Sequence, residues 1–176
     1  MREWEWCQQN PVSRVSSEKE NNKRDRWLNS DEEGRLLTAC APWLQDVVTL
    51  ALNTGLRMGK ILELTWRAVD FNRRTVTVFR SQNGERRTSP VNQAVLTVLK
   101  NKAKVRSLAT DRVFCSKAFT PTESGHLPRA FRLALSKAMI EDFHFHDVRH
   151  IFATTLVQSG IDLYKVRQLL GHNRPL

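Results

Sequence analysis

The chain has 176 residues, of which 40% are hydrophobic, and its formal charge is +10 at pH 7, with a sequence pI near 10.2. This composition predicts one globular domain with a core of its own and excludes a disordered chain. No apolar run approaches the roughly 20 residues that span a bilayer, and the first residues, MREWEWCQQ, do not have the pattern of a signal peptide.

Cysteine is sparse, which bears on both redox state and metal binding. Cys7, Cys40 and Cys115 are far apart, odd in number and form no CxxC pair. This pattern argues against a disulfide framework or a zinc cluster, and it indicates reduced thiols in the cytoplasm.

The basic side chains are concentrated in the second half of the chain. Residues 1–99 hold 15 basic and 12 acidic side chains, whereas residues 100–176 hold 13 basic and 6 acidic ones. The net charges of these two parts are therefore +3 and +7. Such an excess favours a polyanionic partner, most often nucleic acid, although a solvated basic surface gives the same count.

The first third of the chain predicts a linker followed by helices. Residues 1–26 are polar without apolar periodicity, which is typical of a tail and linker. A helix is expected to start at residues 30–33, with a capping Ser or Asp and acidic residues in its first turn. A second helix runs from Pro42 to a glycine stop at Gly55, and a short third helix follows at residues 61–64.

The middle of the chain changes to a period of two. Residues 75–79 alternate as a strand and residues 86–89 provide its antiparallel return, with Asn83-Gly84 as the hairpin turn. Another short strand is expected at residues 112–114. Further helices are expected from Asn92 and over residues 128–139, 146–158 and 162–170. The predicted fold class is α+β, mostly α-helical, with a small antiparallel β-sheet.

The stretch HFHDVRHIFATTL, residues 144–156, crowds three cationic or potentially cationic side chains into five residues. At about 100° per residue, a helix here has an apolar side and a basic side. The apolar side comprises Val148, Ile151, Phe152 and Thr155. His146, Arg149 and His150 point the opposite way, out of the main core and toward a cleft or a neighbouring element.

Three interpretations fit this basic side. It is a solvated surface, a metal site using His146 and His150 at positions i and i+4, or an oxyanion site. Against zinc, no Glu stands at the general-base position of an HExxH motif, and Arg149 adds fixed positive charge. A planar guanidinium fork with imidazole donors fits a phosphate best.

These residues are part of a wider resemblance. The segments TGLRMGKILELTW (54–66), HDVRH (146–150) and LLGH (169–172) resemble, in order and spacing, the three motif boxes of the tyrosine recombinases, the phage-integrase family. The resemblance identifies residues 27–176 as a recombinase catalytic domain. Residues 1–26 are similar to the last helix of the family's DNA-gripping N-terminal domain and the linker after it, so a remnant of that domain is expected there.

The resemblance implies site-specific DNA strand exchange through a phosphotyrosine intermediate, without a metal or other cofactor. Arg57 and Arg149 would hold the nonbridging phosphate oxygens, while His146 would assist in proton transfer or phosphate binding. His172 would hydrogen-bond the phosphate, and His150 would support the site.

The resemblance also implies the binding partners and the cellular location. The partner is double-stranded DNA at attachment or recombination sites, on which family members assemble as homo-oligomers, with neither a membrane nor a small-molecule substrate involved. Arg80, Arg86 and Arg87 on the hairpin would contact this DNA. The expected location is the bacterial cytoplasm, in association with the nucleoid.

Three positions depart from the family pattern. Gln82 stands where the family has its general-acid lysine, and Lys60 stands where a carboxylate usually orients the first arginine. The single tyrosine, Tyr164, precedes the LGH box, whereas the family's nucleophile follows it by about nine residues. We therefore expect a catalytic domain that lacks its tyrosine segment and is inactive alone, as a fragment or as the product of a decayed prophage gene. The alternative function is a DNA-binding accessory protein that occupies such sites without cutting.

Overall fold

The structure, a computed structural model, describes residues 26–79, 87–115 and 125–171. These residues form seven α-helices, one short 3-10 helix and a three-stranded antiparallel sheet. The helices are α1 (Ser30–Ala39), α2 (Pro42–Thr54), α3 (Met58–Leu62), α4 (Gln93–Lys104), α5 (His126–Lys137), α6 (Asp147–Gln158) and α7 (Leu163–Leu170), with the 3-10 helix η2 at Trp66–Ala68. The strands are β1 (Val69–Asp70), β2 (Thr75–Val78) and β3 (Arg87–Pro90). The predicted fold class is confirmed.

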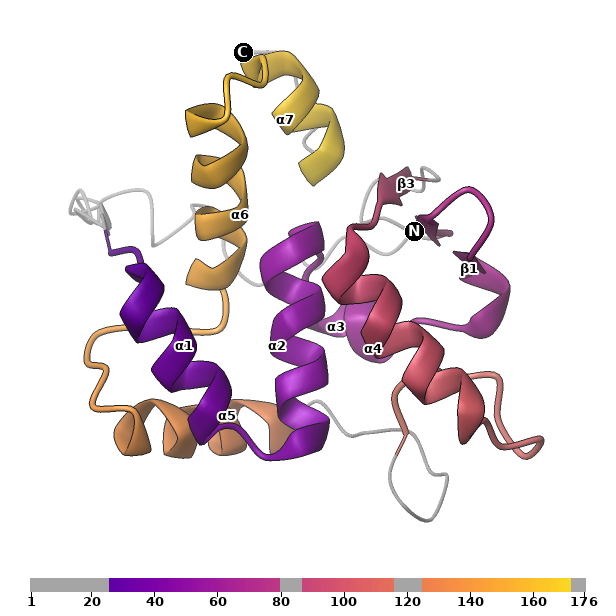
Figure 1. The fold of residues 1–176 in the computed structure, drawn as a ribbon, viewed down its shortest axis with the longest axis horizontal. Coiled ribbons are helices and arrows are strands. Elements are labelled where there is room, and N and C mark those ends of the chain that lie inside the picture. The colour runs from indigo at the N-terminus through magenta and orange to yellow at the C-terminus, as the bar shows by residue number, and fades with distance from the viewer. Residues whose placement is uncertain (1–25, 80–86, 116–124, 172–176) are drawn as a thin grey trace, which may run out of the picture.

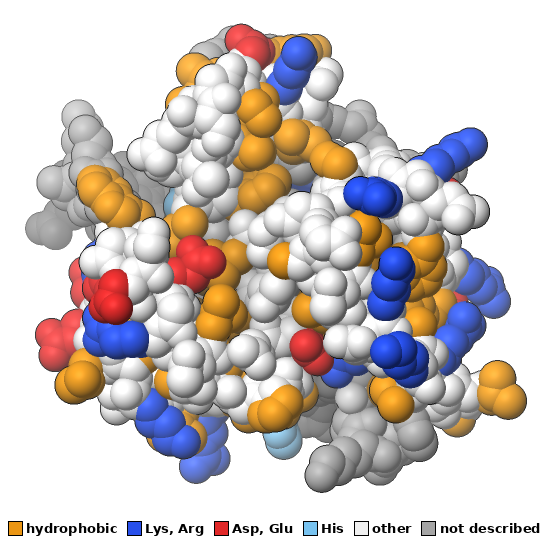
Figure 2. Space-filling view, viewed as in Figure 1, with side chains coloured by type: hydrophobic (Ala, Val, Ile, Leu, Met, Phe, Trp, Pro, Cys, Tyr) orange, Lys and Arg blue, Asp and Glu red, His pale blue; other side chains and the backbone are white. Residues whose placement is uncertain are grey.

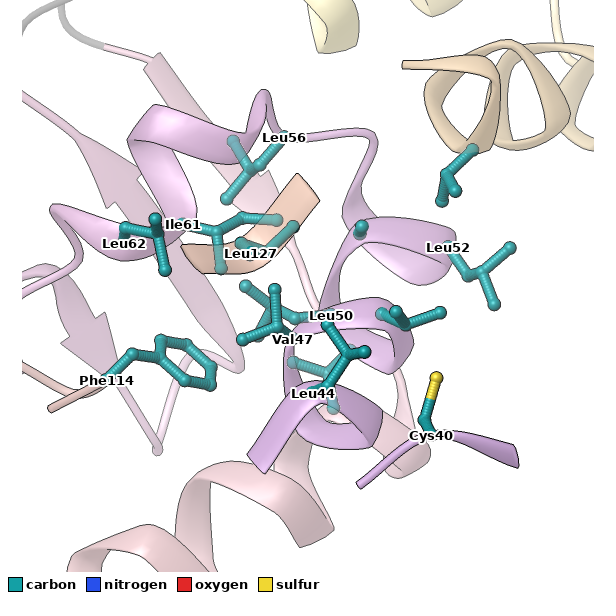
Figure 3. Close-up of a cluster of buried hydrophobic side chains, with 14 of the residues drawn as sticks. Cys40, Leu44, Val47, Leu50, Leu52, Leu56, Ile61, Leu62, Phe114 and Leu127 are labelled. Carbon is teal, nitrogen blue, oxygen red and sulfur yellow. The ribbon is translucent and has the colours of Figure 1, made fainter. Parts of the chain in front are cut away.

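Helix α2 is the centre of the domain. It lies between α1 and α4, with α5 across one of its ends and α6 and α7 at the other end (Figure 1). Seven of its 13 residues are buried, and they lie on more than one side of the helix. Its side chains Leu44, Val47 and Leu50 lie with Leu127 of α5 and Phe114 in one cluster of buried hydrophobic side chains (Figure 3). Because α2 is enclosed in this way, its C-terminal end is held in a fixed position, and the candidate site is built there.

Local sequence signals account for the ends of the helices. Asn29 caps α1 by accepting from the backbone N–H of Glu32, whose carboxylate accepts in return from the N–H of Asn29, a complete capping box. The cap is thus one residue earlier than the Ser or Asp that the sequence predicted. Pro42 opens α2, and Gly55 ends it in the left-handed conformation with φ +60°.

The predicted hairpin is present, and its two strands pair in register. Val76 faces Ser89 and Val78 faces Arg87, while β1 pairs with the other edge of β2. The expected turn at Asn83-Gly84 lies outside the described residues. The prediction of a strand at residues 112–114 is wrong, because in this segment Arg112 forms an isolated β-bridge to Thr65 and no strand.

Helix α6 departs from its predicted faces at two positions. Val148 is fully buried as expected, but Thr155 is exposed because α6 extends past the end of α2, where among the described elements α7 packs beside it (Figure 1). Arg149, which was expected to point out of the core, has only 6% of its surface exposed. The physical reason is that its guanidinium enters a junction between α2 and α7.

Charge is unevenly distributed over the face seen in Figure 2. Acidic side chains gather over α1, whereas Lys and Arg side chains lie over α4 on the opposite side of the same view. Across the described residues, no helix is long and apolar enough to cross a membrane.

Gly55 is the position where the fold is most sensitive to one added methyl group. A Cβ on Gly55 would lie 2.4 Å from Cδ1 of Phe152 and 3.0 Å from Cδ2 of Leu170, on a backbone with positive φ. We expect Gly55→Ala to lower the free energy of unfolding by about 2–5 kcal/mol, from left-handed strain and overpacking together. Urea denaturation followed by circular dichroism measures this change.

Gly34→Ala is the matched control, because Gly34 lies inside α1 with nothing within 4 Å of an added Cβ. This substitution should raise the free energy of unfolding by up to about 1 kcal/mol. Equal effects of the two substitutions would contradict the packing described for Gly55.

Candidate functional site

Four segments that are distant in sequence meet at the C-terminal end of α2. They are the turn Thr54–Arg57, strand β3, the first turn of α6 and the C-terminal end of α7. The guanidinium of Arg149 joins three of them, because its Nη1 donates to the carbonyl oxygen of Gly55 at 2.5 Å and its Nη2 donates to the carbonyl oxygen of Leu170. The three segments that resemble recombinase motif boxes are therefore brought together by hydrogen bonds of a single side chain.

Arg57 stands two residues after the acceptor Gly55. It occupies the position before the first turn of α3, is half-buried, and within the described part of the chain makes no side-chain hydrogen bond or ion pair. The left-handed conformation of Gly55 turns the chain from α2 into α3, and this turn delivers Arg57 to the junction that Arg149 enters.

Arg87 approaches the same junction from the sheet. Its Nη1 lies 2.9 Å from the place where a Cβ on Gly171 would stand, so its guanidinium packs directly against the end of α7. Its Nε is buried and finds no hydrogen-bond acceptor among the described residues. The sequence predicted Arg87 only as a DNA contact on the hairpin. The alternation of side chains along β3 could have indicated that Arg87 points inward. Arg87 lies on the same face of the strand as Ser89, which is 2% exposed.

The three guanidinium groups affect one another electrostatically. Burial, together with the charges of Arg57 and Arg87, lowers the pKa of Arg149 to about 10, and burial is the largest of these causes. Burial likewise lowers the pKa of Arg87 to about 10, with a contribution from Arg57. None of the ion pairs among the described residues brings a carboxylate to these three arginines. The arrangement is thus a cationic site that an oxyanion would neutralise.

Two histidines border this site on the first turn of α6. The rings of His146 and His150 are 5.2 Å apart between centroids and nearly perpendicular, and both residues are exposed. The pKa of His146 is lowered below its usual 6.5, first by partial burial, then by the charges of His150, Arg149 and Arg57, while Asp147 opposes the shift. Near neutral pH the ring is therefore mostly uncharged and can donate or accept one proton.

Lys60 makes an ion pair with a residue close to it in sequence. The sequence suggested a like charge in the position of a carboxylate that orients Arg57. In the structure the ammonium of Lys60 is 2.7 Å from a carboxylate oxygen of Glu63, the C-cap residue of α3. This ion pair offsets the charge that was expected to act on Arg57.

The remaining predicted residues are not brought into the site by the described part of the structure. His172, Gln82, Arg80 and Arg86 lie outside the described residues. Tyr164 is 65% exposed near the start of α7, whereas it is the end of α7 that reaches Arg149. Within the residues that the structure covers, no group of three or more His, Cys, Asp or Glu side chains could hold a metal ion.

Comparison with solved structures defines the class of protein to which this fold belongs. The domain superposes on a lambda integrase dimer bound to a COC' core site with a TM-score of 0.77 and 23% identity, over 96% of this chain and 64% of that one. It superposes on XerA recombinase with a TM-score of 0.75 and 26% identity, over 84% of this chain and 56% of that one. The fold is that of a tyrosine recombinase catalytic domain.

Sequence comparison gives the family. Residues 26–175 match the model of the phage integrase family, and the chain belongs to this family. It is 33% identical to the integrase of Salmonella phage P22 over 97% of this chain, and 30% identical to a shufflon-specific DNA recombinase of Escherichia coli over the same share. It spans about half of these relatives, 46% of the first and 43% of the second. The family resemblance found in the sequence is confirmed.

The two hydrogen bonds of Arg149 predict a measurable contribution to stability. We expect Arg149→Met to lower the free energy of unfolding by about 1–3 kcal/mol, because two buried carbonyl oxygens lose their donors while repulsion among the arginines is relieved. Chemical denaturation gives the value. Arg73→Met is the control, since that side chain is 85% exposed, and it should change stability by less than about 0.5 kcal/mol. A variant at position 149 that is more stable than the parent would contradict the bridging role.

The lowered pKa of His146 predicts a pH dependence with a definite sign. Below pH 6.5 the unfolded chain takes up the imidazole proton before the folded chain does, so the contribution of His146 to stability falls as the pH decreases through this window. An NMR titration of the Cε1 proton should place the midpoint below 6.5, with His146→Gln used to assign the resonance. A midpoint above 6.5 in the free protein would contradict the cationic surroundings.

Proposed function

We propose that this domain binds duplex DNA and holds one phosphodiester between Arg57, Arg149 and His146 for site-specific strand exchange. The observation that carries the proposal is the convergence of two motif arginines and a motif histidine at a site without a carboxylate partner among the described residues. His172 directly follows Gly171, the C-cap of α7, so we assign it a hydrogen bond to the same phosphate. His150 supports this group beside the ring of His146.

The chemistry proposed is a transesterification at phosphorus. A tyrosine hydroxyl loses its proton and its oxygen forms a bond to the phosphorus, the bond from phosphorus to the 5′-oxygen breaks, and the departing oxygen takes up a proton. The phosphotyrosine ester conserves the energy of the broken bond, so a 5′-hydroxyl of another strand can reverse the step. Arg57 and Arg149 stabilise the negative charge that develops on the nonbridging oxygens, and no cofactor is required for this.

The nucleophile and the general acid are the incomplete parts of this assignment. Tyr164 is six residues before Leu170, which corresponds to about 9 Å along the axis of α7, away from the end that meets Arg149. Gln82 cannot deliver a proton to the departing oxygen, because an amide has no acidic proton at neutral pH. We therefore propose that these 176 residues bind the DNA without cleaving it.

The second candidate function follows from the positions of Tyr164 and Gln82. A chain with Gln82 in the lysine position and no tyrosine near the phosphate suits a DNA-binding accessory that occupies recombination sites. In either case the proposed partner is double-stranded DNA in the bacterial cytoplasm, at the nucleoid, and the chain is proposed to assemble with further copies on that DNA. A nicked suicide substrate tests both assignments, because neither lets this chain cleave DNA, and we expect no covalent protein–DNA adduct. A tyrosine-linked adduct would contradict this assignment.

DNA binding predicts a steep dependence on salt. The logarithm of the association constant should fall linearly with the logarithm of salt concentration, and Arg57→Ala should reduce the slope by about 0.9, the value for one lost phosphate contact. Gel-shift titrations at several salt concentrations measure both quantities.

Arg132→Ala is the charge-matched control for this titration. Arg132 is exposed on α5, at the end of α2 opposite to Gly55 (Figure 1), and its loss should leave the slope unchanged. Binding that is insensitive to salt, or equal losses from the two substitutions, would contradict a phosphate contact at Arg57.

A further inference from the structure

Arg87 is a charged group of the site that neither the motif boxes nor the proposed chemistry uses. It comes from β3, outside the three recombinase segments, and is half-buried beside Arg57 and Arg149. Its guanidinium lies against Gly171, so close that any larger residue at position 171 would have to displace it. A side chain placed in this way has a fixed direction.

The hydrogen bonding of Arg87 is incomplete. Its Nε–H is buried and has no acceptor in the part of the chain that the structure describes, whereas Arg149 donates to two carbonyl oxygens. A buried donor without an acceptor is unfavourable, and a buried charge beside two like charges is more so. Both costs are removed at once by an oxyanion, which supplies acceptors and opposite charge in the same place.

We infer that Arg87 is a third phosphate-holding residue, which donates to an oxygen of the phosphodiester that Arg57 and Arg149 bind. The inference rests on the proposed function only for the identity of the anion as a DNA phosphate. Arg87 reaches the anion from the sheet, while Arg57 comes from the turn between α2 and α3 and Arg149 from α6. Three guanidinium groups from three elements would surround the phosphate and define its orientation.

This role is electrostatic and does not include proton donation. Gln82 leaves the hairpin without the family's lysine, and Arg87 on the same hairpin supplies positive charge there instead. Burial and Arg57 lower its pKa to about 10 in the free protein, but a bound anion raises the pKa of an adjacent guanidinium. Arg87 therefore keeps its proton in the complex and stabilises charge on the phosphate.

Inorganic phosphate is the probe for this inference, because it tests the site without DNA. Isothermal titration calorimetry at constant ionic strength would compare the parent chain with Arg87→Ala, Arg57→Ala and Arg132→Ala. We expect Arg87→Ala to weaken phosphate binding by roughly tenfold or more, as for the loss of a charge-assisted hydrogen bond. Arg132→Ala removes the same charge at a distance and should change the affinity by less than about twofold.

Arg87→Lys separates the geometry from the charge. Lysine keeps the positive charge but has neither the planar fork nor an Nε–H at the buried position, so its affinity for phosphate should lie between those of the parent and Arg87→Ala. If Arg87→Ala does not fold, Arg87→Lys decides the matter, and an affinity equal to that of the parent would overturn the inference.

The outcomes separate this inference from the proposed function. Loss of phosphate binding in Arg57→Ala with normal binding in Arg87→Ala would overturn the role of Arg87 alone. Normal binding in both variants would overturn the shared phosphate site, and with it the proposed function. Urea denaturation without phosphate provides a further test. If Arg87 has a purely structural role, Arg87→Ala should unfold at a lower urea concentration than the parent chain. The inference predicts an equal or higher urea midpoint, because the substitution relieves like-charge repulsion.

Discussion

The hydrogen bonds of one buried guanidinium organise this domain's proposed site. Arg149 donates to the last turn of α2 and to the last turn of α7, and its own backbone belongs to the first turn of α6. Carbonyl oxygens at helix C-terminal ends carry partial negative charge and lack partners within the helix, so a cation between two such ends satisfies both. This contact also fixes two neighbouring positions. Arg57 stands two residues after the acceptor Gly55, and Gly171 stands directly after the acceptor Leu170.

The same contact requires charge to be concentrated where it is unfavourable. Burial and mutual repulsion lower the pKa values of Arg149 and Arg87, which means that their charged forms are disfavoured by the free fold. Backbone carbonyl groups compensate this in part, but within the described residues no carboxylate does. The cluster therefore lowers the stability of the free fold, but its charges are already arranged for an anion. Active sites often combine these two properties.

Much of the fold could be predicted from the sequence because its signals are local. Pro42 and Gly55 mark the two ends of α2, and the alternation of Thr75–Val78 marks a strand. The burial of Arg149 could not be predicted, since helical periodicity places a residue on a side of its own helix and says nothing of what the neighbouring helices offer there.

For the candidate site, the motif spacing was sufficient to select Arg57, His146 and Arg149, but it gave no reason to include Arg87. That residue enters through the register of β3 against β2 and through the approach of α7, both of which are tertiary contacts. Lys60 shows a similar limit. Its spacing from Arg57 predicts a like charge near that arginine, but it gives no sign of the ion pair that Lys60 makes with Glu63.

The light packing of α7 has a consequence for how DNA would be sensed. Only Val166 and Leu170 of this helix are buried, so its attachment depends strongly on the carbonyl oxygen that Arg149 holds and on the contact of Gly171 with Arg87. Both arginines belong to the proposed anion site, and linkage requires that a ligand and a local ordering equilibrium strengthen each other equally. Binding of a phosphate would thus make the opening of α7 less favourable, and an open α7 would in turn weaken phosphate binding by the same factor.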